Sequence, residues 1–180
     1  MTEDFATMLA VGGKKNTLGL AERVVQLVLA DHSRLDELYR CLFEDDAWLR
    51  MRAIDALEKV CRVHPEWLEP YADRLLGEVA AIDQASIQWH LAELFREIDL
   101  SPEQRERAIV IMKRNIASGR ADWIVASNTM ETLAGFVANG MLPAAELTPL
   151  LEIQQAHHSK AVVKRATRII HELTGESNGV

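Results

Sequence analysis

The sequence predicts an all-α protein built from stacked helical hairpins, and three observations predict it. Apolar residues recur at spacings of three and four along almost the whole chain, as on the buried face of an amphipathic helix. No stretch alternates strictly between apolar and polar residues, so no strand is expected. A similar apolar pattern returns about every 38 residues, which indicates a repeat protein. Because one such unit cannot bury its apolar face alone, neighbouring units must stack into a continuous core.

The repeat defines one helix of each hairpin, which we call the second helix. Its copies lie at residues 49–60, 87–98, 125–136 and 162–173, after a degenerate first copy at 20–31. The first helices are expected between them, at about 33–43, 65–80, 102–117 and 143–156. This arrangement predicts a tail at residues 1–15, one repeat domain at 16–175 and a short tail at 176–180.

The expected breaks between helices carry the chemistry of helix ends. Ser101 precedes Pro102, which is the order of an N-cap and a first helical residue. Helix ends are expected at three dipeptides, namely His64-Pro65, Ser118-Gly119 and Asn139-Gly140.

The composition is that of one globular domain or one short repeat array. The chain has 180 residues, of which 48% are hydrophobic and 26% charged, so it is long enough for a core and too apolar to be disordered. Two cysteines are too few for a disulfide framework, which favours a reducing, cytoplasmic setting. No segment approaches the roughly 18 apolar residues of a membrane span, and the acidic start of the chain is unlike a signal peptide.

The copy at residues 46–57 carries a more specific pattern than the others. It has an Asp, then an apolar–Arg pair, then spaced Ala and Leu, at Asp46, Leu49, Arg50, Ala53, Ala56 and Leu57. In these residues the chain resembles the HEAT-repeat family of α-solenoids, including small prokaryotic members without an assigned activity. The other copies keep the apolar frame but replace the Arg by Gln88, Ala126 and Val163.

The resemblance covers roughly residues 18–173 and implies both a fold and a mode of binding. It implies a right-handed α-α superhelix of about five hairpin repeats. In this family the second helices usually line the concave face, and that face usually binds another macromolecule. The motif itself is specific for architecture and not for function.

On a helical wheel, the outward side of residues 50–62 carries Met51, Arg52, Asp55, Glu58, Lys59 and Arg62, and that of residues 88–98 carries Trp89, His90, Glu93, Arg96 and Glu97. Equivalent outward positions of the second helices should form columns across the stacked repeats. One column is rich in hydrogen-bond donors, the next is acidic in its middle, and a third contains Met51 and Trp89. A Trp on the polar side of its helix is a typical interface anchor. The predicted partner-binding surface comprises Met51, Arg52, Asp55, Trp89, His90, Glu93, Arg96, Asn128, Glu131, Arg165 and Arg168.

From this surface we predict non-catalytic binding of a protein or peptide. The donor column of Arg52, His90, Asn128 and Arg165 suits peptide carbonyls and acidic side chains. Two plainer interpretations remain open at this stage. The columns can be a solvated face with ion pairs between neighbouring helices, and Trp89 can pack on Met51 between repeats.

The last second helix carries the one basic patch, at Lys160, Lys164, Arg165 and Arg168. It can receive an acidic partner segment, a phosphate group or a second copy of the chain. Alternatively, it is the polar outer face that a terminal repeat needs for solubility.

No catalytic residue, metal site or cofactor is expected. There is no HExxH motif and no zinc spacing of Cys and His, while Cys41 and Cys61 are typical of small core residues. His157 and His158 point about 100° apart on a helix and cannot chelate together well. The run Gly12-Gly13-Lys14-Lys15 lacks the remaining residues of a phosphate-binding loop.

The enzyme alternative comes from the resemblance alone. Some HEAT-like proteins excise alkylated bases from DNA with Trp and Asp side chains in a concave cleft, and Trp89, Trp123, Asp55 and Arg52 supply such types here. The net charge of -7 disfavours this alternative, and nucleic acid in general, because phosphate contacts need clustered Lys and Arg. A second analogy, to bilin-attaching lyases with HEAT-like repeats, has no motif beyond the repeat.

Overall fold

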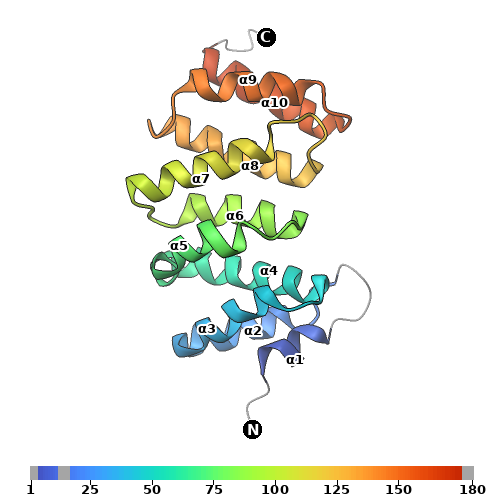
Figure 1. Ribbon diagram of the computed structural model, residues 1–180, viewed down its shortest axis with the longest axis vertical. Helices are drawn as coiled ribbons and strands as arrows, with labels where there is room; N and C mark the ends of the chain where they lie inside the picture. Colours follow the sequence, from blue (N-terminus) through green and yellow to red (C-terminus); the bar gives the residue numbers. More distant parts are fainter. Residues whose placement is uncertain (1–3, 12–16, 176–180) are drawn as a thin grey trace.

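The computed structural model describes residues 4–11 and 17–175, and within these ranges all regular structure is helical. The helices follow one another along the long axis of the molecule, from α1 at one end to α9 and α10 at the other (Figure 1). The prediction of an all-α solenoid is therefore confirmed. In the described ranges no helix is both long enough and apolar enough to cross a bilayer.

The five predicted second helices form one continuous row. They are α2 (Ala21–Ala30), α4 (Ala47–Val63), α6 (Ala85–Glu97), α8 (Trp123–Ala138) and α10 (Lys160–Thr174). Each of them packs against the next, so that equivalent helices lie side by side. We call these five helices the second-helix row.

The first helices form a less regular layer against this row. They include α3 (Leu35–Arg40), α5 (Ala72–Arg74), α7 (Pro102–Asn115) and α9 (Ala144–Gln155), together with the 3-10 turns η1 (His32–Arg34), η2 (Cys41–Phe43), η3 (Pro65–Trp67) and η4 (Glu69–Tyr71) and the π-helix η5 (Leu75–Val79). We call this set the first-helix layer.

The prediction of a continuous helix at 65–80 is wrong. The segment is divided into η3, η4, α5 and η5. Pro70 lies inside it, lacks a backbone N–H and clashes with the carbonyl four residues earlier, which disfavours a continuous α-helix at this point. Gly77 further lowers the helix propensity, and the backbone there adopts the wider π geometry.

The helix ends follow the predicted capping chemistry. The Ser101 side chain accepts from the backbone N–H of Gln104, and the Gln104 side chain bonds back, which completes a capping box at the start of α7. Asp46 caps α4 in the same way by accepting from the N–H groups of Trp48 and Leu49. At the other end of a helix, Gly140 follows α8 with φ +70°, a conformation that favours glycine.

The expected N-terminal tail is in part a helix. Helix α1 (Phe5–Ala10) packs against the start of the row, with Phe5 and Leu9 fully buried. The Phe5 N–H donates to Glu37 Oε1 at 2.8 Å, and the Arg34 guanidinium lies 3.8 Å from the centre of the Phe5 ring. Residues 4–11 therefore close the N-terminal end of the core. The run Gly12 to Lys15 lies outside the described residues.

Candidate interaction surface

The repeat period is visible in the hydrogen bonds that join one repeat to the next. The Thr132 hydroxyl of α8 donates to the carbonyl of Ala92 in α6 at 2.8 Å, across 40 residues of sequence. The Gln154 amide of α9 donates to the carbonyl of Ile116 at 2.8 Å, across 38 residues. These spacings are about one repeat length, so equivalent segments of neighbouring repeats lie side by side, as the predicted surface requires.

At the N-terminal end of the row, charged side chains pair across neighbouring helices. The Lys59 ammonium lies 3.0 Å from Asp55 on its own helix and 3.7 Å from Glu22 on α2. Arg62 of α4 lies 3.5 Å from Glu93 of α6. Two of the predicted surface residues, Asp55 and Glu93, are thus part of these pairs.

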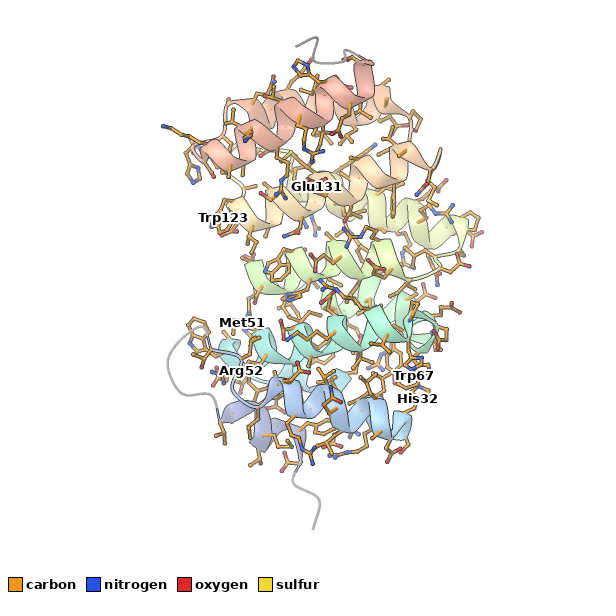
Figure 2. All side chains as sticks on the ribbon, turned by 180° about the vertical axis from the view of Figure 1, so that it is seen from behind. His32, Met51, Arg52, Trp67, Trp123 and Glu131 are labelled. Atoms are coloured by element: carbon orange, nitrogen blue, oxygen red, sulfur yellow. The ribbon has the colours of Figure 1, made fainter. Side chains whose placement is uncertain are left out.

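At the C-terminal end, Glu131 is the centre of a second network. Arg165 of α10 lies 3.3 Å from the Glu131 carboxylate, and Arg168 bonds to the same carboxylate. Arg168 also pairs with Glu172 at 2.7 Å. Figure 2 shows Glu131 in the upper part of the view, on the side of α8 that faces α10. Glu131 is the one charged side chain of α8, and in the described residues no ion pair joins α8 to α6.

Arg52 is placed differently from the prediction. Its side chain is only 4% exposed, and its guanidinium donates to the carbonyls of Leu9 at 2.7 Å and Thr17 at 2.8 Å. The helical wheel of α4 assigned Arg52 to the solvent face, which is wrong because the N-terminal segment covers this position. Arg52 therefore holds the N-terminal segment on the row and does not present donors to a partner.

His90 is also buried, with 2% exposure, so the expectation of an exposed donor is wrong here too. Its Nδ1 lies 2.6 Å from the carbonyl of Ser86, and its Nε2 lies 3.9 Å from Asp55 Oδ1. Burial raises the pKa of Asp55, but the neighbouring His90 ring and Lys59 ammonium outweigh this effect, so that the pKa lies below its ordinary value. The Asp55 carboxylate is therefore held as an anion beside the His90 ring.

Glu58 is a buried acid that the wheel also assigned to the solvent face. It is 3% exposed and bonds to Arg62 one turn later. Burial raises the pKa of Glu58 above its ordinary value, and the charge of Arg62 offsets this only in part. The spacing of four residues between Glu58 and Arg62 is the one sequence signal that could have indicated this pair.

The Trp89 ring is half-buried and stacks on the ring of His90, with centroids 3.4 Å apart. Met51 and Asn128 are likewise half-buried, and the Asn128 amide donates to the carbonyl of Ile124 at 3.0 Å. Arg96 is exposed and pairs with Glu97 at 3.1 Å. The surface thus combines a half-covered aromatic ring with charges that are already paired.

Two further tryptophans lie at opposite edges of the molecule (Figure 2). Trp123, the first residue of α8, is 52% exposed. Trp67 lies between two imidazole rings, with centroids 4.2 Å from His32 and 4.0 Å from His64. The sequence did not indicate this stack, because His32 lies far from His64 and Trp67 along the chain.

The described residues offer little for covalent or metal chemistry. Burial raises the pKa of both Cys41 and Cys61 to about 12, so each thiol stays protonated at neutral pH and is a poor nucleophile. Within the described ranges, no three His, Cys, Asp or Glu side chains lie close enough together to hold a metal ion. Of the side chains that the base-excision alternative requires, Arg52 is bonded to backbone carbonyls and Asp55 to Lys59.

Comparison with known proteins gives one family. The family model described as HEAT repeat domain matches residues 15–109, which extend from before α2 into α7. No curated protein and no solved structure matches the chain. The matched part includes the N-terminal charge network but not Glu131 and its partners on α10.

Proposed function

We propose a binding function for this chain, which belongs to the HEAT-repeat family of helical repeat proteins. In this proposal it is a non-catalytic scaffold or adaptor in the cytoplasm, and it holds a protein or peptide along the second-helix row. Repeat proteins of this kind use the extended surface that stacking creates, and the family typically mediates protein interactions. The two buried free cysteines fit a reducing compartment.

The observation that carries the proposal is the half-buried Trp89 ring on the middle helix of the row, which keeps part of its surface in contact with solvent. Its stack on His90 fixes the orientation of the ring before a partner arrives, so less entropy is lost on binding. Large aromatic side chains held in this way dominate the binding energy of interfaces. Met51, at the equivalent position of α4, is half-buried and would extend the apolar contact.

The surrounding ion pairs support a partner with alternating charges. The Arg165, Arg168 and Glu131 side chains keep between a third and a half of their surface in contact with water, so each pair contributes well under about 1 kcal/mol. Such pairs can be exchanged for pairs with a partner at little cost. Arg96 and Asn128 would supply further donors to peptide carbonyls, while Arg52 and His90 support the surface from below.

A tryptophan pair in the same chain allows a matched test. Trp89→Ala should leave the helical circular dichroism spectrum unchanged and weaken partner binding at least tenfold, which corresponds to about 1.4 kcal/mol. Trp123→Ala, at the exposed start of α8, should leave the affinity within about twofold. The partner is first captured from native cytosol, and its affinity for each variant is then measured by isothermal titration calorimetry.

The opposite pattern would contradict the proposal. If the wild type and Trp89→Ala bind the partner with equal affinity, Trp89 is not an anchor of the interface. Loss of the fold in Trp89→Ala makes the residue part of the core. Salt-sensitive binding of duplex DNA by the wild type at moderate ionic strength would instead favour a nucleic-acid function.

A further inference from the structure

A second recessed surface lies on the first-helix layer and shares no residue with the proposed binding row. It is a hollow of about 490 Å³, within the range of known ligand pockets. Leu76 of the π-helix η5 lines one side, and one face of α7 lines the other with Glu103, Glu106, Arg107, Val110 and Ile111. These α7 positions follow the helical spacing of three and four, so they form a continuous stripe about 12 Å long.

The floor of the hollow is apolar, and the fold covers it only in part. Val110 is 66% exposed, which is the highest value among the large apolar side chains of the described residues. Ile111 beside it is half-buried, and Leu76 closes the floor from the π-helix. Both of these side chains also pack against the core, and helix α7 attaches to the core through its opposite face, where Ala108 and Met112 are buried. Val110 is therefore the apolar side chain of the hollow that the fold leaves exposed.

The rim of the hollow is acidic. The charge of Arg107 is neutralised by Asp73, because its Nη1 lies 2.6 Å from the Asp73 carboxylate. Glu103 and Glu106 are exposed, and no cation of the described part of the chain pairs with either of them. The hollow thus presents two uncompensated carboxylates beside an apolar floor.

We propose that this hollow is a second docking site, which takes a short amphipathic helix of another protein whose apolar side chains are flanked by Lys or Arg. Leucine-sized side chains would cover Val110 and Ile111, and the flanking cations would pair with Glu103 and Glu106. The stripe matches about two turns of such a helix in length. The π-helix that borders the hollow fits this role, since single π turns are frequent at functional sites.

The test uses a fluorescein-labelled synthetic helical peptide, with Leu residues on one face and Lys and Arg on both sides of that face. Titration with the full chain, followed by fluorescence anisotropy, should give saturable binding. Val110→Lys should weaken this binding at least tenfold, because it fills the floor and repels the cations. The double variant Glu103→Gln with Glu106→Gln should weaken it by a similar factor and remove most of its salt dependence.

Val63 supplies the matched control for Val110. It is also an exposed valine, with 56% exposure, but it lies at the end of α4. Val63→Lys should bind the peptide as the wild type does, and so should Trp89→Ala, which separates this site from the proposed binding row. Val110→Ala, which cannot disturb the core from an exposed position, should weaken binding in the same direction as Val110→Lys.

Three results would overturn the docking site. The first is the absence of saturable binding up to about 1 mM peptide, which is the weak end of measurable affinities. The second is equal weakening by Val63→Lys and Val110→Lys. The third is equal binding of a control peptide in which Glu replaces every Lys and Arg.

Discussion

The two helical layers of this protein share one repeat period but differ in regularity. In the second-helix row, α4 runs unbroken for 17 residues, α8 for 16 and α10 for 15. In the first-helix layer, α7 has 14 residues and α9 has 12, but α3 has only 6 and α5 only 3, and these two are continued by turns of other geometry. The row is packed on both sides by its neighbours, whereas the layer has Pro70 and Gly77 at positions that break a helix. Stacking therefore demands regular helices in one layer and tolerates breaks in the other.

Both layers use ion pairs to join neighbouring helices, and they differ at one place. In the row, ion pairs link α2 to α4, α4 to α6 and α8 to α10, and buried polar groups bond to backbone carbonyls of the neighbouring segment. In the first-helix layer, ion pairs link α3 to α5, α5 to α7 and α7 to α9. Glu103 and Glu106 of α7, beside the hollow, have no cation partner among the described residues.

The largest effect is expected from the buried cation of the row. Arg52→Met should lower the free energy of unfolding by about 3 kcal/mol, because the carbonyls of Leu9 and Thr17 lose charged donors in a buried place. Urea unfolding measures this difference. Arg40→Met, at an exposed position, is the control and should stay within about 0.5 kcal/mol of the wild type. Equal stability of the Arg52 variant would show that the N-terminal segment is not held by this side chain.

A smaller loss of stability is expected when a buried hydrogen-bond donor of the first-helix layer is removed. The buried Gln154 amide of α9 donates to the carbonyls of Ile116 and Ser118, which follow α7. Gln154→Met should cost about 2 kcal/mol by leaving these carbonyls without a donor. Gln155→Met removes only an exposed contact with Thr167 and should cost less than about 0.5 kcal/mol. A ranking in which Gln154→Met costs more than Arg52→Met would reverse the comparison between the layers.

The smallest effects concern two carboxylates of α4 whose pKa values shift in opposite directions. Asp55 has a lowered pKa, so its charge stabilises the fold above its ordinary value of 3.8, and this contribution is lost as the pH falls through the folded-state pKa. Glu58 has a raised pKa, so the fold loses stability as the pH rises through 4.5 and Glu58 becomes charged. Each effect should be about 1 kcal/mol or less.

Two amide variants should therefore depend on pH in opposite ways. Relative to the wild type, Asp55→Asn should be less stable at pH 7, and the difference should close below pH 3.8. Glu58→Gln should become more stable relative to the wild type as the pH rises through 4.5. Chemical denaturation between pH 3 and 7 measures both, and parallel profiles would contradict the assigned directions.

The helical class, the order of the helices and the stacking of the second helices could all be predicted from the sequence. These features follow from the apolar spacing, the period of about 38 residues and caps such as Ser101, all of which are local or periodic and can be read along one chain. The sequence predicts a tail where α1 forms, because six helical residues without a repeat give too weak a pattern.

Which polar side chains of the row reach solvent could not be predicted from the sequence, because it depends on how distant segments pack together. A helical wheel describes one helix, and it assigned Arg52, Glu58 and His90 to the outer face. Their burial depends on what covers them from elsewhere in the chain, as the segment at Leu9 and Thr17 covers Arg52. The hollow beside Val110 was hidden for the same reason, since it exists only where η5 and α7 come together. Burial is a property of the assembled neighbours, and periodicity along one helix does not contain it.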